Sequence, residues 1–292
     1  MTIAIAIIIS GLTLGSMYAV SSVSLSLLWG TLGVLNMAQG AFLVIGAYAA
    51  FTAATMFGLP APLAILLTVL VGALTGLITY FGLVRFLMNR PGFETAVIIG
   101  TFGLSLIVQN LVLRSYGAYP FSQPLAVTGG FNFGQSYIPY QNVVIFLASI
   151  LIMIVVALIL NRTRMGRAIR ATAQNGAAAQ LMGVPVGRIF LQVFLIAGVL
   201  AAVSGTMLSS ITTLSPTMGY DPMLKAFIVC VVAGLGNVYG ALAASFMIGL
   251  IEAAVEYYLG VKYGFPMLLL LIILTLIWRP AGIFGFRAVA RQ

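Results

Sequence analysis

Long apolar runs separated by short polar connections dominate this chain. Runs such as Val143–Leu160 and Met267–Trp278 are apolar on every side and do not alternate with polar residues. A membrane-spanning helix needs about 20 mainly apolar residues, whereas a membrane β-strand alternates over about ten. The pattern predicts helices embedded in lipid, over the residue ranges 3–28, 40–57, 62–84, 95–113, 141–160, 189–212, 223–236, 238–258 and 264–279.

The composition supports this prediction, because 62% of the 292 residues are hydrophobic and only 6% are charged. A soluble domain carries about 25% charged residues. We therefore expect an all-α, polytopic transmembrane helical bundle with about eight to nine spans, forming a single transmembrane domain over residues 1–292. No basic residue precedes the first apolar segment, so we expect that segment to be retained as a span.

The basic residues suggest an orientation for these spans. Cytoplasmic connections of membrane proteins carry the excess of Lys and Arg. If the basic groups at 85–90, 162–188 and 279–291 lie inside, the intervening segments alternate consistently, and only Arg114, Lys225 and Lys262 fall on or near the outer side. This predicts a cytoplasmic C-terminus and, if all nine segments cross, an N-terminus outside. The net charge of +9 then reflects topology and does not indicate nucleic-acid binding.

Two glycine-rich interruptions, at 30–41 and 234–241, break apolar segments in the two halves of the chain. Paired breaks of this kind mark the central pathway of many transporters, because irregular backbone at membrane depth must be buried in protein or face a wet cavity. For any single glycine, close helix packing is the better explanation. Asn36 and Gln39, within the first break, favour the pathway.

Acid–base and metal chemistry lack the residues they need here. The chain has no histidine, one cysteine and four acids, and no Gly-Lys pair for a phosphate-binding loop. No catalytic residue, metal ligand or cofactor is therefore assigned, and any ATP hydrolysis belongs to another chain. Asp221-Pro222 is expected to cap a helix. Glu252 and Glu256 share one helix face, either as a proton site or as a surface-level, ion-paired position near Lys262.

Two connections are long enough to contact partners. Loop 114–141 holds seven aromatic residues, which either anchor the protein at the interface or form a docking surface. Loop 161–188 begins with an arginine cluster and continues as an Ala-rich stretch, Ala168–Met182, which ends before Gly183 and Pro185. This predicts one short helix at the inner surface, which either seats in a soluble partner or simply lies on the membrane.

Several short motifs resemble the permease subunits of branched-chain amino acid ABC importers. They follow the family's order through almost the whole chain: Gly11-Leu-Thr-Leu-Gly15-Ser-Met17-Tyr18-Ala19, Gly33-Val-Leu-Asn36-Met-Ala-Gln39-Gly40, Thr101-Phe-Gly103-Leu-Ser105-Leu-Ile-Val-Gln109-Asn110, Arg162-Thr-Arg164-Met-Gly166-Arg167-Ala168, Gly234-Leu-Gly236 and Arg279-Pro280-Ala-Gly282-Ile-Phe284-Gly285. Ala178-Ala179-Gln-Leu-Met-Gly183 is similar to the loop by which ABC permeases contact their ATPases, although Ala177 stands where the general pattern has Glu.

The resemblance implies a multi-pass permease of the bacterial inner membrane that pairs with a second, related permease. It also implies two cytoplasmic ATPase subunits and a periplasmic or outer-surface substrate-binding protein. The expected ATPase-coupling residues are Arg164, Arg167, Ala178, Ala179 and Gly183. The expected translocation path is lined by Asn36, Gln39, Thr101, Ser105, Gln109 and Asn237.

The scarcity of charge favours a zwitterionic or neutral cargo. The family resemblance suggests leucine, isoleucine or valine, while other amino acids, urea and short amides stay open. The main alternative is a proton-coupled secondary transporter of a small neutral or zwitterionic solute, driven through Glu252 or Glu256. A membrane scaffold without transport activity is a third class. Whether the permease pairs with a different chain or another copy is not determined by the sequence.

Overall fold

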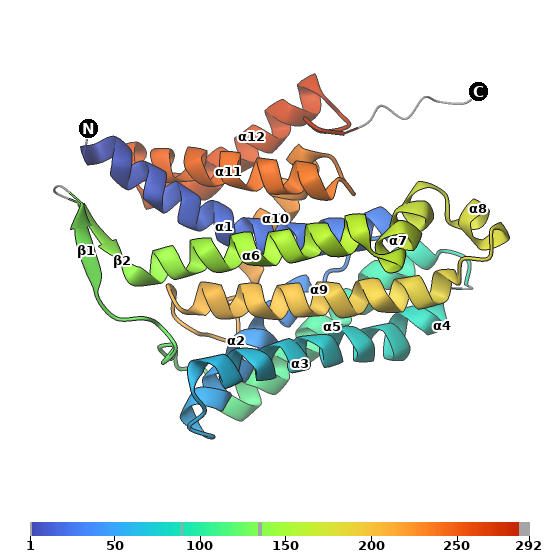
Figure 1. Cartoon of the computed structure of the whole chain (residues 1–292), viewed down its shortest axis with the longest axis horizontal. Helices are drawn as coiled ribbons and strands as arrows, with labels where there is room; N and C mark the ends of the chain where they lie inside the picture. Colours follow the sequence, from blue (N-terminus) through green and yellow to red (C-terminus); the bar gives the residue numbers. More distant parts are fainter. Residues whose placement is uncertain (1, 89, 134–135, 286–292) are drawn as a thin grey trace.

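The protein is a bundle of apolar helices, described by a computed structural model for residues 2–88, 90–133 and 136–285. Figure 1 shows most of the helices running along the long axis of the molecule. In chain order the helices are α1 (Thr2–Leu32), α2 (Gln39–Thr55), α3 (Ala61–Thr79), α4 (Arg85–Leu87), α5 (Phe93–Tyr116), α6 (Tyr140–Arg162), α7 (Arg164–Gln174), α8 (Gly176–Leu181), α9 (Val186–Ser209), α10 (Tyr220–Ala233), α11 (Val238–Leu259) and α12 (Gly264–Trp278). A π-helical turn, Tyr80–Val84, joins α3 to α4, and a 3₁₀ turn, Val261–Tyr263, precedes α12.

Seven helical stretches among the described residues are long and apolar enough to cross a membrane. A helix satisfies its backbone hydrogen bonds internally, which is why apolar segments adopt this structure in lipid. The expectation of a helical membrane bundle is confirmed. Two predicted segments form shorter helices: α2 has 17 residues and α10 has 14. At about 1.5 Å per residue, α10 covers only about 21 Å of the roughly 30 Å hydrocarbon core.

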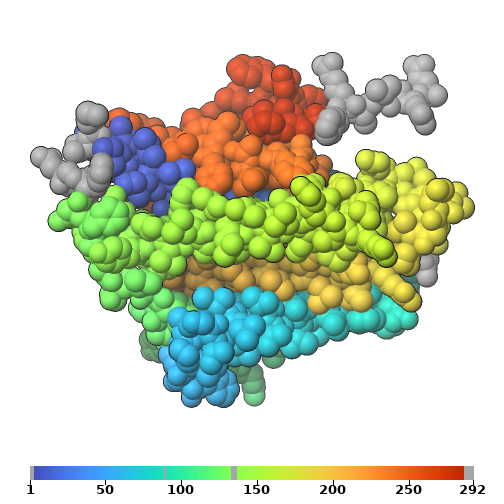
Figure 2. Space-filling model, viewed as in Figure 1, coloured from blue at the N-terminus to red at the C-terminus, as the bar shows by residue number. Residues whose placement is uncertain are grey.

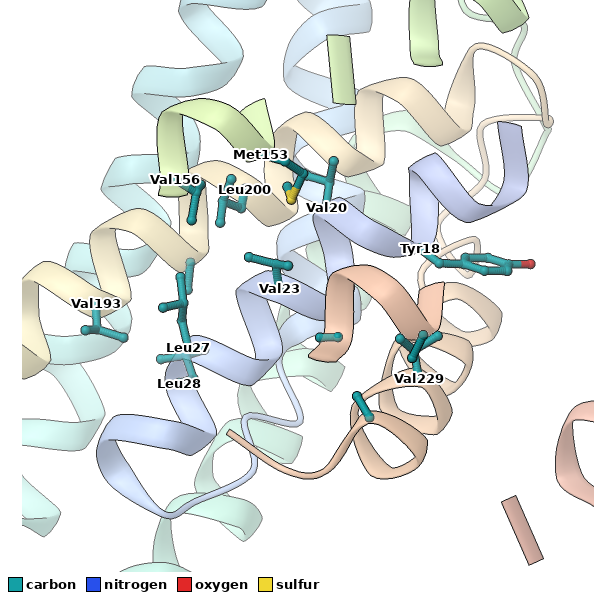
Figure 3. Packing of buried hydrophobic residues seen from close by; sticks show 14 of the residues in the cluster. Tyr18, Val20, Val23, Leu27, Leu28, Met153, Val156, Val193, Leu200 and Val229 are labelled. Atoms are coloured by element: carbon teal, nitrogen blue, oxygen red, sulfur yellow. The ribbon is translucent and has the colours of Figure 1, made fainter. Parts of the chain in front are cut away.

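The core is built around α1. Apolar side chains of α6, α9, α10 and α11 pack against it, and Figure 3 shows Val20, Val23 and Leu27 among these neighbours. Glycine brings two of the helices close together: a Cβ atom added at Gly15 would lie 2.9 Å from the Cα atom of Phe246 in α11. Such small-residue contacts stabilise helix pairs in lipid, where no hydrophobic effect drives their association. Figure 2 shows α6, α9 and α3 as neighbouring bands across one face.

The two ends of the bundle carry different connections. Strands β1 (Gly130–Phe133) and β2 (Ser136–Pro139) form an antiparallel hairpin that lies at the same end as the start of α1 (Figure 1). Helices α4, α7 and α8 lie at the opposite end. We call these the hairpin end and the α7–α8 end. Arg85, Arg162 and the arginines of α7 therefore gather at one end, which agrees with the predicted alternation of the segments.

The hairpin was not predicted, because loop 114–141 was interpreted only as a long connection rich in aromatic residues. Its strands pair Gly130 with Pro139 and Phe131 with Ile138, and Ile138 is buried whereas Phe131 and Tyr137 are exposed. Two of the loop's aromatic residues join it to α2: Tyr116 packs on Tyr48, and Phe121 packs on Phe51. Tyr119 and Tyr137 stay exposed, so the aromatic set divides between anchoring and surface positions.

Candidate functional site

The short helices α2 and α10 begin next to each other inside the bundle. A Cβ atom added at Gly40, in the first turn of α2, would lie 2.7 Å from the carbonyl oxygen of Gly219, which immediately precedes α10. The two backbones therefore touch where each helix starts. Glycine at both positions makes this approach possible, since any side chain would meet backbone atoms. We call this contact the helix-start junction.

A neutral hydrogen-bond network fixes the start of α2. The fully buried Gln39 donates from Nε2 to Ser24 Oγ at 3.1 Å, and Ser24 Oγ donates to the carbonyl oxygen of Ala197 at 2.8 Å. Asn36 Oδ1 accepts from the backbone N–H of Ala38 at 3.1 Å. These hydrogen bonds connect the first break to α1 and α9. They also give the buried amide of Gln39 a hydrogen-bond partner, as buried polar groups need.

Helix α5 adds three of the predicted path residues beside this break. Thr101 Oγ1 accepts from the backbone N–H of Met37 at 3.0 Å, which joins α5 to the first break. Ser105 and Gln109 line a small pocket together with Gly40, Thr217 and Tyr220. The Tyr220 hydroxyl donates to Gln109 Oε1 at 2.6 Å. The structure therefore brings Asn36, Gln39, Thr101, Ser105 and Gln109 into one neighbourhood at the helix-start junction.

Asn237, the sixth predicted path residue, lies elsewhere. It caps α11 by accepting from the backbone N–H of Gly240 at 2.9 Å, and it donates to the carbonyl oxygen of Phe284 at 2.9 Å. It lines a separate cavity of about 720 Å³. The last turns of α1, helix α7 and the 235–239 turn surround this cavity, which is therefore near the α7–α8 end. The start of the first glycine-rich break also lines this cavity through Gly30 and Gly33, and Gly30 packs against Gly236 of the second break.

A buried ion pair joins α10 to α11. Lys225 Nζ lies 2.6 Å from Glu252 Oε1, and the Tyr18 hydroxyl donates to Glu252 Oε2 at 2.7 Å. Lys225 Nζ also donates to the Tyr18 oxygen at 3.1 Å. Figure 3 shows the Tyr18 hydroxyl pointing away from the other labelled side chains of the apolar cluster. We call Tyr18, Lys225 and Glu252 the buried triad.

The triad corrects two expectations. Glu252 is fully buried and paired with Lys225, so it is not a surface-level acid paired with Lys262. Lys225 lies within the bundle rather than at the outer side. The pairing was missed because Lys225 and Glu252 are 27 positions apart on different helices, and no local spacing indicates such a contact. Burial makes an unpaired charge costly, which favours pairing of two charges placed inside the bundle.

The predicted ATPase-coupling segment forms two helices instead of one. The expected helix over Ala168–Met182 is interrupted at Asn175, which has an extended backbone with φ −161° and ψ 102°. Its Oδ1 accepts from the backbone N–H of Ala178 at 3.0 Å and so starts α8. The Asn175-Gly176 dipeptide is a known turn former and could have indicated this break.

The coupling residues are mostly on the surface of this helix pair. Arg164, Arg167 and Ala178 are exposed, whereas Ala179 is buried. Gly183 follows α8 with φ +83°, a conformation that favours glycine. Two neighbouring residues were overlooked: Leu181 is 89% exposed and Met182 is 85% exposed. Their place at the end of an Ala-rich run, before Gly183, is the pattern that marks them.

The start of α10 also differs from the expectation. Gly219 is the N-cap residue, Asp221 lies in the first turn, and no side chain caps this helix. Asp221 was expected to be the cap, but the helix begins one residue before it. Its carboxylate is therefore not used to cap the helix, and the residue is exposed.

Comparison with known proteins identifies the family. The profile of the family described as the branched-chain amino acid transport system permease component matches residues 7–277. The high-affinity branched-chain amino acid transport system permease protein BraD of Pseudomonas aeruginosa is 31% identical over 95% of this chain and 94% of its own. LivH of Escherichia coli, with the same description, is 29% identical over 94% of both chains.

A more distant organism has a similar chain. The probable branched-chain amino acid transport permease protein LivH of Methanocaldococcus jannaschii is 30% identical over 90% of this chain and 87% of its own. The comparison with solved structures found no match. The family match covers most of the chain and nearly all of its membrane helices. This chain belongs to the family of branched-chain amino acid transport system permease components.

Proposed function

We propose that this protein is the membrane permease subunit of an ATP-driven importer of branched-chain or related amino acids. The observation that carries this proposal is the family match over residues 7–277, together with BraD and LivH relatives aligned over nearly their whole length. The chain has no phosphate-binding Gly-Lys motif, so we assign ATP hydrolysis to separate subunits.

All nine apolar helices belong, in this proposal, to one domain of the bacterial inner membrane over residues 1–292. The α7–α8 end faces the cytoplasm, because Arg85, Arg162 and the arginines of α7 gather there. The N-terminus then lies outside and the C-terminus inside. Helices α2 and α10 complete two of the nine crossings together with the irregular segments before them. Their adjoining starts support an internal likeness of the two halves.

The translocation path passes the helix-start junction. Ser105 and Gln109 line the small pocket there, and Asn36, Gln39 and Thr101 shape the backbone behind it. Polar groups within a membrane bundle are costly, which supports a transport role for this concentration of amides and hydroxyls. Asn237 belongs to a second wet region, the cavity of about 720 Å³ beside α7.

Helices α7 and α8 couple the path to the ATPases. Leu181 and Met182 supply an exposed apolar tip that fits a groove of a soluble partner, while Arg164 and Arg167 are exposed on α7. Ile169, Arg170 and Gln174 of α7 also line the cavity that contains Asn237. A push on α8 that moves α7 would therefore change the shape of this cavity.

The proposed assembly contains a second permease, two cytoplasmic ATPase subunits and an outer substrate-binding protein. Affinity purification of the tagged chain in mild detergent should recover the permease and ATPase components. Proteoliposomes containing the assembly, with ATP inside and leucine bound to its binding protein outside, should accumulate leucine. Accumulation should persist with an uncoupler and stop without ATP. Uptake that an uncoupler abolishes while ATP is retained would contradict the proposal and favour a proton-driven carrier.

A glycine variant tests the coupling role. Gly183→Val forces a β-branched residue into a left-handed conformation beside the exposed tip and should abolish co-purification of the ATPases. Gly58→Val is a matched control, since Gly58 has φ +60°, equally open space and no place in α7 or α8. Retention of the ATPases by Gly183→Val would count against this docking site.

A further inference from the structure

The start of α10 presents an acid on a face of the bundle that no described element covers. Asp221 and its neighbours Tyr220 and Leu224 are exposed, and none of residues 220–225 is buried. The rest of α10 is different, since Ile228, Cys230 and four other residues are buried in the core. The first turns of α10 therefore face the surroundings of this chain, whereas the later turns face its core.

This face lies within the depth of the hydrocarbon core. Lys225, one turn after Asp221, donates to the hydroxyl of Tyr18 near the middle of α1. Tyr220, immediately before Asp221, donates to Gln109. Residues 110–116 of α5 continue beyond Gln109 for about 10 Å of helix. The 24 residues of α5 span about 36 Å, and a hydrocarbon core of about 30 Å centred on this helix would include Gln109 and the Tyr220 hydroxyl bound to it. We therefore place the start of α10 near this depth.

The charge of Asp221 is not balanced by the nearest cation. Lys225 is already paired with Glu252, and this is the single ion pair among the described residues. An acid in the first turn of a helix gains about 0.3–1 kcal/mol from the helix dipole. Exposing Asp to lipid at the centre of a membrane costs about 2.5–3.5 kcal/mol on insertion scales. The gain from the helix dipole is smaller than the cost of exposing the carboxylate to lipid. This face of α10 is therefore not expected to contact lipid.

We propose that Asp221 lines the transport path and contacts the ammonium group of a zwitterionic amino acid as it passes. This inference rests on the proposed function and adds a residue outside the predicted path set. The surroundings suit such a cargo. The adjacent Tyr220 lines the small pocket with Thr217 and Gln109, which supply neutral polar groups, and Leu224 supplies exposed apolar surface on the next turn. An unpaired carboxylate attracts a cationic group, whereas weak neutral neighbours permit release.

Substitution tests the charge. In proteoliposomes containing the complete assembly, Asp221→Asn should lower leucine uptake at low leucine by about tenfold, the factor that 1.4 kcal/mol produces. Asp221→Glu should keep most of the uptake. Glu94→Gln is the matched control, since Glu94 is an exposed acid in the first turn of α5 and should tolerate neutralisation. Unchanged uptake in Asp221→Asn would overturn the inference.

Thiol labelling tests the exposure to water. The chain has one cysteine, the buried Cys230, so Asp221→Cys is made in a Cys230→Ser background. In the assembled transporter this thiol should react with a charged methanethiosulfonate, and leucine should slow the reaction. Leu151→Cys, at an exposed apolar position in the middle of α6, should stay unreactive. An unreactive residue 221 would place this face against lipid or protein and contradict the inference.

Co-purification separates the remaining alternative. If Asp221→Asn releases the second permease, the acid pairs with a cation of that partner, and the cargo contact is wrong. If the wild-type assembly takes up no amino acid at all, the proposed function itself fails. If wild type transports and both tests at residue 221 are negative, only this inference fails.

Discussion

Helices α2 and α10 begin in contact with each other, yet their starts are held in different ways. The start of α2 is neutral and enclosed: 11 of its 17 residues are buried, and Gln39 and Ser24 bind each other without charge. The start of α10 is charged and open: the buried triad holds one side, and Tyr220, Asp221 and Leu224 face outward on the other.

The comparison shows how a membrane bundle supports two interrupted helices. At the start of α2, several weak hydrogen bonds together hold the helix in place, and each contributes about 0.5–1.5 kcal/mol to stability. At the start of α10, one ion pair supplies most of the polar attachment, and its members depend on each other because an unpaired buried charge is costly. This difference suggests that the start of α2 is a fixed part of the scaffold, while the start of α10 is held mainly by one ion pair and contacts the path.

The largest effect is expected from breaking the buried triad. Glu252→Gln or Lys225→Met leaves one charge inside the bundle without its partner, which costs about 3–5 kcal/mol. The double variant Lys225→Met/Glu252→Met removes both charges and should recover most of the loss. The midpoint temperature of unfolding in detergent measures both effects. Equal losses in the single and double variants would show that the pair acts in another way, for example through Tyr18.

A smaller loss is expected where the two helix starts touch. Gly40→Val places side-chain atoms against the carbonyl of Gly219, where the neighbouring backbone cannot move away easily. Overpacking of this kind costs about 1–3 kcal/mol. The same midpoint measurement should show the loss, and leucine uptake should fall with it. Gly103→Val is the control, because a Cβ atom there meets nothing within 4 Å, and it should leave the midpoint nearly unchanged.

The sequence predicts the helices better than the contacts between them. All nine apolar segments are helical, because apolar composition alone determines which stretches can satisfy their backbone in lipid. The grouping of Asn36, Gln39 and Thr101 was also predictable, since the family motifs and the first break indicated it. Asn237 was assigned to the same path, but the turn at 235–239 keeps it beside α7.

The errors involve contacts between distant parts of the chain or single turn residues. Lys225 and Glu252 pair across two helices, and only the packing of α10 on α1 and α11 brings them together. Helix 168–182 was interpreted from its alanines, whose helix propensity is high. Asn175 overrides that propensity with one capping hydrogen bond. A prediction that averages helix propensity over a segment includes neither tertiary contacts nor capping by a single side chain.

The smallest of the three effects is expected at Gln39, and it tests the contrast directly. Gln39→Leu removes the hydrogen bond to Ser24 but leaves Ser24 bound to the carbonyl of Ala197, so we expect a loss of about 1 kcal/mol. Gln39→Glu should cost more, because it introduces a charge at a fully buried position with no cation in the network. Both are measured as shifts of the unfolding midpoint beside Glu252→Gln. If Gln39→Leu destabilises the protein as much as Glu252→Gln, charge does not distinguish the two attachments. The start of α2 would then depend on Gln39 as strongly as α10 depends on its ion pair.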